Sequence, residues 1–484
     1  MGLPAVWHAG HVSWDRREFL AALGVGSASS LMFAFGCGAP IAPPRAPAQR
    51  VADVRGWLRD AVGKLAAVFP TVHALAVTRS RTTAAIDVLG IGVARARRDG
   101  VVLSVQDAKG KWREHVTADL SRNGIETAVR MLGGARTAKA LDLEVPPPPL
   151  DLREIDELEL KNRLGATQRG DLSAPSSRIV YAAALIDIDD VDVWSVSPAH
   201  DRQQRTRRIR NRATRAAWAG TRPQIDEVER GWSGNLGDPA ALADADVISA
   251  TMKALQQLTP GQPTEGEANV VLEPGVVASV IDVAVRGLLT STATRRPEVA
   301  KRLGSGATLS PLLSLADDPL VPGSYGGILF DDDGELATRV PLLDTGKVVG
   351  RLSRGTRAGH VGALEVAPSN LVLQPGTVPR SQLLVDGWLL EGRVSVAYDP
   401  ASDRVVLTVA RARELKNGSD TGRVFANVEL AGELATLLSR VDGVAADTGT
   451  TIVREDIGGE PRWRTISAPW LRTRGFVRAG RGIA

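Results

Sequence analysis

The chain has 484 residues, of which 43% are hydrophobic and 24% charged, and its net charge at pH 7 is +4. This length predicts two or three domains, and the composition excludes a disordered or membrane-spanning chain. The modest charge does not require a nucleic-acid partner, and the single cysteine, Cys37, excludes an intrachain disulfide, a multi-cysteine zinc site and an iron–sulfur cluster.

Residues 1–37 have the layout of an export signal. Arg16 and Arg17 precede Glu-Phe-Leu and a moderately apolar run that is too short for a transmembrane helix, which is typical of the twin-arginine route. Cys37 ends an Ala-Phe-Gly-Cys box that resembles a lipoprotein cleavage site, although a plain cleaved signal remains the alternative. With the Pro/Ala-rich tether at 38–50, these features predict a periplasmic protein anchored to the membrane by a lipid on Cys37.

Residues 51–257 are predicted to form an N-terminal region that mixes helices with short strands. Within it, two subdomains are expected, at 51–145 and 165–257. Helices are predicted at 51–69, 121–131, 151–163 and 238–257. The first has apolar residues at helical spacing, and 151–163 is rich in charged residues. Alternation predicts strands at 73–78, 84–95, 100–106, 111–117, 179–188 and 192–196, with turns at Asp99-Gly100 and Lys109-Gly110.

The most basic stretch lies within residues 205–215. Arg208, Arg210 and Arg212 alternate with Ile209 and Asn211, which is the period of one solvated face of a strand. No aromatic platform of the kind that stacks bases accompanies them. We therefore do not expect nucleic-acid binding.

Residues 258–269 form the predicted linker, and residues 270–484 are predicted to form a β-rich, barrel-like domain with a short helix near 431–438, which makes the chain an α+β protein. A helix over 273–289 opens this domain. Its Asp282 and Arg286 are spaced to pair on one helical face. A structural ion pair is favoured over a contact with substrate.

Common catalytic and metal motifs are missing from the exported part. No two of its histidines have ligand spacing, and no nucleotide-binding loop or serine-hydrolase elbow occurs. The acidic run Asp331 to Glu335 does not fit a calcium loop, because Leu329 and Val340 would occupy its first and last ligand positions. We expect no metal and no cofactor, with a metal site made only of carboxylates as the alternative.

Residues 310–352 carry the most specific pattern in the sequence, an Asp-Asp-Pro followed by a Gly-rich turn, an Asp-Asp-Gly turn and a Gly-containing hairpin. This pattern resembles the TldD/PmbA family, and looser likeness extends over roughly residues 55 to 475. Ser324 stands where the family has a glycine. The matching residues are Asp317, Asp318, Pro319, Pro322, Gly323, Gly326, Asp332, Asp333, Gly334, Gly346 and Gly350.

The resemblance implies where a metal would be bound in the family's peptidase chains. There, the helix after the linker carries His-Glu-x-x-x-His, whose histidines bind zinc while the glutamate acts as general base. The corresponding residues here are Ile281, Asp282 and Arg286, and the family's C-terminal cysteine ligand is also missing. No residue is therefore assigned a catalytic or metal-binding role.

Two functions are compatible with this reading. The chain is either a non-catalytic, TldE/PmbA-like subunit that pairs with a zinc-bearing TldD-like chain to degrade flexible peptides, or a stand-alone peptide-binding lipoprotein of the cell envelope. A homodimer is an alternative to the mixed pair. A third and weaker hypothesis is an enzyme that uses Asp317, Asp318 or the cluster Asp331 to Asp333, although aspartates beside Pro or Gly usually shape turns.

Overall fold

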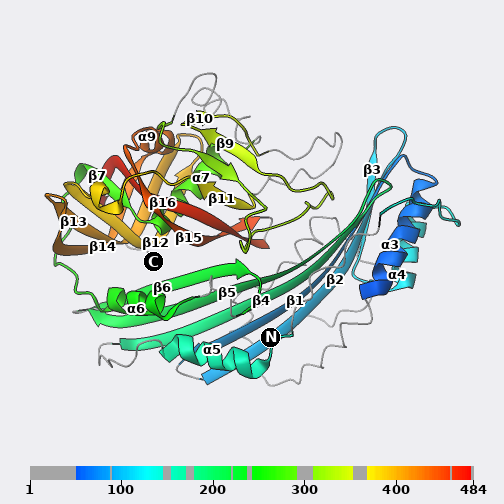
Figure 1. Cartoon of the computed structure of the whole chain (residues 1–484), viewed down its shortest axis with the longest axis horizontal. Coiled ribbons are helices and arrows are strands. Elements are labelled where there is room, and N and C mark those ends of the chain that lie inside the picture. Colours follow the sequence, from blue (N-terminus) through cyan, green and yellow to red (C-terminus); the bar gives the residue numbers. More distant parts are fainter. Residues whose placement is uncertain are drawn as a thin grey trace, which may run out of the picture.

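The computed structural model describes residues 51–87, 90–144, 154–169, 179–219, 222–236, 242–290, 309–352, 368–457 and 460–480. Arg16, Arg17, Cys37 and the predicted tether lie outside the described residues. The described chain folds into two sheets with helices packed on them, which confirms the α+β class (Figure 1).

The N-terminal sheet is antiparallel, with strand order β3-β2-β1-β4-β5-β6. Its strands are longer than predicted. Strand β2, for example, is continuous because Asp99 and Gly100 do not break the ladder and pair with Thr78 and Val77. The turn at Lys109-Gly110 is present and separates β2 from β3. The strands are β1 (Thr71–Asp87), β2 (Gly90–Gln106), β3 (Trp112–Thr117), β4 (Ile179–Val196), β5 (Asp201–Ala219) and β6 (Arg222–Ser233).

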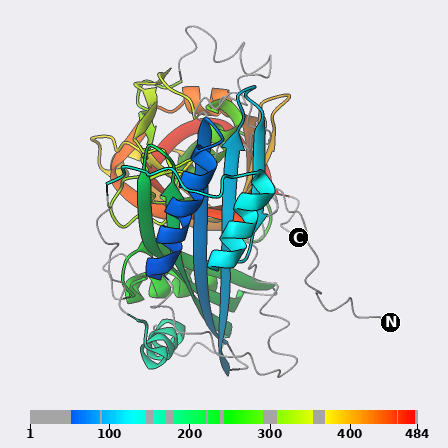
Figure 2. The ribbon, with the colours of Figure 1, turned by 90° about the vertical axis from the view of Figure 1, so that its right-hand side faces the viewer.

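Helices α3 (Val51–Ala66) and α4 (Arg122–Leu132) lie side by side on one end of this sheet, as Figure 2 shows in blue and cyan. Their apolar faces form a core with β1, β2 and β4. Ser121 caps α4 by accepting a hydrogen bond from the backbone N–H of Gly124 at 3.1 Å. The sequence therefore placed these two helices correctly.

Helix α5 spans Glu157–Arg169 instead of the predicted 151–163, and α6 spans Asp244–Leu255 within the predicted 238–257. Helix α5 packs on the face of the N-terminal sheet that carries Ile186, Ile188 and Ile209. Because strand side chains alternate, Asp187, Asp189 and Arg210 project from the opposite face.

The C-terminal region contains a closed ring of strands, since β7 pairs with both β12 and β16. The ring consists of β7 (Gly266–Leu272), β12 (Gly387–Asp399), β13 (Arg404–Lys416), β14 (Ser419–Glu433) and β16 (Glu460–Ala479). The remaining elements are β8 (Leu315–Asp317), β9 (Val340–Asp344), β10 (Lys347–Val348), β11 (Asn370–Leu373), β15 (Gly443–Ile457), the 3-10 turn η2 (Arg380–Leu383) and α9 (Leu434–Ser439).

Helix α7 (Pro274–Leu288) lies against β7, β12, β15 and β16 (Figure 1). Eleven of its residues are buried, and they occupy every side of the helix. A helix that is apolar all round requires such a position, because no side of it can face water without cost. Its burial inside the strand ring explains why the sequence of this segment is almost uninterruptedly apolar.

The two regions are joined by polar contacts along β6. The backbone N–H of Ser233 donates to the carbonyl oxygen of Gly323 at 2.8 Å. Nη1 of Arg230 donates to the carbonyl oxygen of Thr450 at 3.0 Å. Helix α6 ends at Leu255 and β7 begins at Gly266. The division into domains at the linker stays a prediction.

Candidate functional site

The middle of α7 holds the residues that the resemblance equates with a metal motif. Ile281 is 1% exposed and packs in the hydrophobic core of the strand ring. Asp282 is the one charged residue among the buried positions of this fully described helix. The Nε and Nη2 atoms of Arg286 lie 3.0 Å and 2.8 Å from Oδ2 of Asp282. The ion pair predicted from the four-residue spacing is therefore present.

Asp282 has a second cationic partner, which the spacing could not reveal. The Nε atom of Arg464 on β16 lies 2.8 Å from Oδ1 of Asp282, and the two side chains are 2% and 3% exposed. This contact is an ion pair without the alignment of a hydrogen bond. The guanidinium also donates from Nη1 to the carbonyl oxygen of Pro368 at 3.3 Å. Each carboxylate oxygen of Asp282 therefore faces an arginine.

These residues do not fit the zinc centre that the resemblance implies for the family's peptidase chains. Ile281 offers only an alkyl group, and zinc in proteins is held by Cys, His and carboxylate ligands. The only carboxylate of the helix middle faces two guanidinium groups, which are permanently charged and repel a dication. Within the described ranges, no grouping of three His, Cys, Asp or Glu could hold a metal ion.

Asp317, at the end of β8, has a structural role. Its Oδ1 accepts hydrogen bonds from the backbone N–H groups of Ser369 and Asn370, each at 2.9 Å, and from the hydroxyl of Ser369 at 2.7 Å. Burial raises the pKa of Asp317, which these bonds and the charge of Arg464 oppose. The carboxyl holds β8 to the start of β11, so the hypothesis that it acts as a catalytic acid gains no support.

The other residues of the Asp-Asp-Pro and Gly-rich pattern build a turn around Asn370. The Nδ2 atom of Asn370 donates to the hydroxyl of Ser324 at 2.8 Å and to the carbonyl oxygen of Asp318 at 3.2 Å, while its Oδ1 accepts from Gly326 N at 3.0 Å. A methyl group on Gly326 would overlap the carbonyl oxygen of Ser369. Ser324, which replaces the family's glycine, is accommodated because Asn370 uses its hydroxyl.

Pro319, Asp318 and Gly323 also support this turn. The carbonyl oxygen of Pro319 accepts from Ile328 N at 3.2 Å, and the carboxyl of Asp318 accepts from Leu320 N at 3.1 Å. Gly323 has a φ of 70°, a left-handed conformation that glycine adopts without strain. These contacts fix the turn that Gly323 presents to β6.

Asp332, Asp333 and Gly334 lie in a separate turn, away from Asn370. Oδ1 of Asp331 accepts from the N–H groups of Asp333 and Glu335, both at 2.9 Å, as expected of an acidic turn. Gly334 has a φ of 78° and lies directly over Ser195 and His200 of the N-terminal sheet. The pattern residues therefore make two turns that dock on the N-terminal region at different places.

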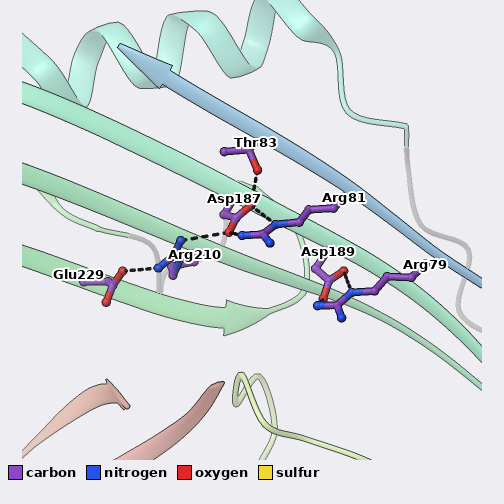
Figure 3. A network of polar contacts seen from close by, with 7 residues as sticks. All are labelled: Arg79, Arg81, Thr83, Asp187, Asp189, Arg210 and Glu229. Atoms are coloured by element: carbon purple, nitrogen blue, oxygen red, sulfur yellow. Dashed lines mark hydrogen bonds and ion pairs between the residues drawn. The ribbon is translucent and has the colours of Figure 1, made fainter. Parts of the chain in front are cut away.

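The face of the N-terminal sheet opposite α5 carries a network of charged residues (Figure 3). Asp187 accepts from the hydroxyl of Thr83 at 2.7 Å, from Nε of Arg81 at 2.8 Å and from Nη2 of Arg210 at 3.1 Å. Nη1 of Arg210 also bonds Glu229 at 3.2 Å. We call this set, together with the pair formed by Arg79 and Asp189 at 2.5 Å, the polar layer.

The polar layer corrects the prediction that the arginines of β5 line a solvated face. Arg210 is 6% exposed, and its guanidinium carbon lies 4.3 Å from the ring centroid of Trp463 on β16. Burial alone would raise the pKa of Asp187, but the hydrogen bond and charge of Arg81, with the charge of Arg210, lower it overall. The basic face is neutralised by acids of β4 and β6 and covered by the C-terminal region.

Three consecutive residues of β16 join these features. Trp463 stacks on Arg210, Arg464 pairs with Asp282, and the hydroxyl of Thr465 accepts from Tyr325 N at 2.8 Å. Tyr325 is 5% exposed, and burial followed by the charges of Asp189 and Asp187 raises the pKa of its phenol. Because side chains of a strand alternate, β16 contacts the polar layer and the Gly-rich turn from one face and the Asp282 ion cluster of α7 from the other.

The C-terminal region is similar to a known domain family. Residues 265–480 match the model of the PmbA/TldA metallopeptidase C-terminal domain. The chain also matches Metalloprotease MJ0996 of Methanocaldococcus jannaschii with 24% identity over 222 residues, which is 41% of this chain and 48% of that protein. The chain thus spans about half the length of this curated relative, and its residues 265–480 are similar to a metallopeptidase-related domain of PmbA/TldD type.

Solved structures share the fold over most of the chain. TldE from Thermococcus kodakarensis superposes with a TM-score of 0.64 and 16% identity, covering 85% of this chain and 97% of that one. A proposed modulator of DNA gyrase from Bacteroides thetaiotaomicron superposes with a TM-score of 0.66 and 16% identity. The superposition covers 89% of this chain and 99% of that one. A proposed modulator of a DNA gyrase from Thermotoga maritima superposes with a TM-score of 0.64 and 15% identity, covering 84% of this chain and 96% of that one. At these identities, the likeness establishes the fold.

Proposed function

We propose that this chain is a non-catalytic, TldE-like subunit that pairs with a zinc-bearing TldD-like chain in the proteolysis of flexible peptides. The observation that carries the proposal is the surrounding of Asp282. Arg286 and Arg464 face its two carboxylate oxygens in the helix where the resemblance implies histidine ligands and a general base. The match to the PmbA/TldA domain and the TldE-like fold support the relationship to TldE-like chains.

The ion cluster supports a structural role for this helix in place of a catalytic one. Asp282 and the side chain of Arg464 are almost wholly removed from water, and two buried opposite charges are held only when they stay paired. A water molecule activated for peptide hydrolysis would need a free base or a metal beside it. With Ile281 as the preceding residue, the helix offers neither, so hydrolysis is assigned to the partner chain.

Affinity purification of the full chain from its native host tests this proposal, with zinc quantified and associated chains identified by mass spectrometry. We expect a His-Glu-x-x-x-His protein to co-purify, with zinc in proportion to that partner. A metal-free preparation that returns bound peptides and no such chain would instead favour a stand-alone peptide-binding lipoprotein.

We further propose that the chain is exported by the twin-arginine route and held at the membrane through an acylated Cys37. The support is the order Arg16, Arg17, apolar run and Cys37 in the sequence. No helix in the described part of the chain is long and apolar enough to span a membrane. Cys37→Ser should move the protein from the membrane to the soluble periplasmic fraction, and Arg16→Lys with Arg17→Lys should keep it in the cytoplasm. Unchanged fractionation of both variants would refute the assignment.

A further inference from the structure

A buried ion pair joins the two regions near the start of β6. Nη2 of Arg411 on β13 donates to Oδ1 of Asp226 on β6 at 3.0 Å, across a separation of 185 residues. The two side chains are 2% and 4% exposed, so the pair is almost wholly removed from water. Strand β6 is the last strand of the N-terminal sheet and runs along the C-terminal region (Figure 1). The pair therefore lies where the sheet meets the strand ring.

The strand ring holds the guanidinium of Arg411 in place. Oε1 of Glu391 on β12 lies 3.6 Å from Nε of Arg411 and accepts a hydrogen bond from Nε of Arg413 at 2.9 Å. Gly392 has a φ of 84°, and a Cβ atom there would lie 2.9 Å from Nη2 of Arg411. The guanidinium is thus enclosed by its own region on one side and meets Asp226 on the other.

The chain segment that connects α6 with β7 is attached to both regions beside this pair. The backbone carbonyl of Gln256 accepts a hydrogen bond from Nε2 of Gln224 on β6 at 2.7 Å, while its Oε1 accepts from Nη2 of Arg413 at 3.0 Å. Three residues later, the backbone N–H of Thr259 donates to the carbonyl oxygen of Val424 on β14 at 2.7 Å. The segment therefore reinforces the contact between β6 and the strand ring.

Strand β6 contacts the C-terminal region again toward its other end, through Arg230 and Ser233. A strand rises about 3.3 Å per residue, so Asp226 and Ser233 lie about 20 Å apart along β6. A contact at one point leaves two bodies free to rotate about it, whereas contacts at separated points restrict that rotation. The pair at Asp226 and the contacts near Ser233 together determine how the sheet is oriented against the strand ring.

The surroundings of the pair make it a poor source of stability. Burial raises the pKa of Asp226 by more than the charge and the hydrogen bond of Arg411 lower it, so the ionised carboxyl is less favourable here than in water. Replacing a buried ion pair by apolar residues of similar volume is often neutral or stabilising, and the best-attested role of such pairs is to fix register. A displaced pair would leave both charges buried without a partner, which is costly. The pair therefore favours a single arrangement.

We propose that the ion pair of Asp226 and Arg411 is an orienting clasp, which fixes the angle between the N-terminal sheet and the strand ring without adding to the stability of the fold. When the clasp is removed, the regions stay joined through Arg230 and Ser233 but sample a range of angles. The inference goes beyond the proposed subunit function and does not depend on a partner chain.

Distances between spin labels on the two regions test the clasp. In the full chain with Cys37→Ser, the labels are attached at Lys161→Cys on α5 and Lys416→Cys on β13, whose native side chains are 42% and 67% exposed. The test variant is Asp226→Leu with Arg411→Met. We expect its distance distribution to be at least about twice as broad as that of the chain with the pair intact. Its melting temperature should stay the same or rise.

The matched control is Asp282→Leu with Arg464→Met, which replaces a buried pair of the same residue types within the C-terminal region alone. Its distance distribution should keep the width of the chain with both pairs intact. Asp226→Asn is a second test variant, which removes the charge and keeps the shape of the side chain. This variant should also broaden the distribution, because it leaves Arg411 without its partner on β6.

Three outcomes overturn the proposal. An unchanged width in Asp226→Leu with Arg411→Met would show that the pair does not set the angle. Equal broadening in the matched control would show that loss of any buried pair loosens the chain. A double variant at Asp226 and Arg411 that does not fold, or that melts below Asp226→Asn, would show that the pair acts through stability instead of orientation.

Discussion

The two regions bury Asp–Arg pairs in different surroundings. In the strand ring, Asp282 is 3% and Arg464 2% exposed at the side chain, and one carboxylate serves two guanidinium groups. In the N-terminal sheet, Arg81 remains 19% exposed, and charges of opposite sign alternate along Arg81, Asp187, Arg210 and Glu229. The same type of ion pair, Asp with Arg, is therefore part of an enclosed cluster in the strand ring and of an extended network in the N-terminal sheet.

This difference determines what each cluster contributes. Removing one charge from an enclosed cluster leaves its partner uncompensated in a medium of low dielectric constant. In an extended network, each remaining charge keeps a neighbour of opposite sign, and solvent at the edge screens the loss. The enclosed pair of Asp282 and Arg464 should therefore be sensitive to the loss of either charge, whereas a single substitution in the polar layer should cost less.

Asp282→Asn is expected to have the largest effect. It leaves Arg464 as a buried cation that has lost its carboxylate, so the free energy of unfolding should fall by about 3–5 kcal/mol. Chemical denaturation followed by circular dichroism measures this loss. A decrease below about 1 kcal/mol would mean that the enclosed pair contributes no more than an exposed ion pair, which would contradict the comparison.

The double substitution Asp282→Leu with Arg464→Met sharpens the comparison. Replacing a buried ion pair by apolar residues of similar volume is often neutral or stabilising, so most of the stability lost in Asp282→Asn should return. The same denaturation measurement compares the double variant with each single variant. Additive losses would show that Asp282 and Arg464 are not coupled.

Asp187→Asn should cost less, about 2 kcal/mol near neutral pH, because it weakens charge-assisted hydrogen bonds while the arginines keep other neighbours. Since the pKa of Asp187 is lowered in the folded chain, its contribution is complete above the ordinary carboxyl range and disappears as pH falls through the lowered value. Urea denaturation from about pH 5 downward to about pH 2 should therefore show the difference between Asp187→Asn and the unsubstituted chain shrinking. A gap that widens with acid would contradict the sign.

Arg286→Ala should have the smallest effect, about 0.5–1 kcal/mol. Its side chain is 40% exposed, and Asp282 retains Arg464 when it is removed. A modest decrease in melting temperature is the expected result. An unchanged melting temperature combined with loss of partner binding would reassign Arg286 from a structural pair to an interaction surface.

Local signals predicted much of the fold. The periodicity of α3 and α4 and the apolar sequence of α7 identified these helices because burial on a helical face leaves a local pattern. Strand lengths were underestimated, since Asp99-Gly100 is a turn signal that the paired neighbours on β1 override. Helix α9 begins at Leu434, later than predicted at 431, because β14 extends to Glu433.

The site was predicted only where its contacts are close in sequence. The spacing of Asp282 and Arg286 revealed their pair, whereas Arg464 reaches the same carboxylate from a strand near the other end of the chain. The arginines of β5 have the alternation of a solvated face, and only the packing of Trp463 and Tyr325 shows that this face is covered. Contacts between distant segments leave no periodic trace in a single sequence.

The central claim is that arginine charges occupy the surroundings of Asp282 in place of a metal. The most direct measurement is the zinc content of the purified, isolated full chain, together with its melting temperature with and without a chelator. We predict substoichiometric zinc and an unchanged melting temperature, because the cluster is complete within the chain. One tightly bound zinc per chain, with a melting temperature that falls on chelation, would contradict the account.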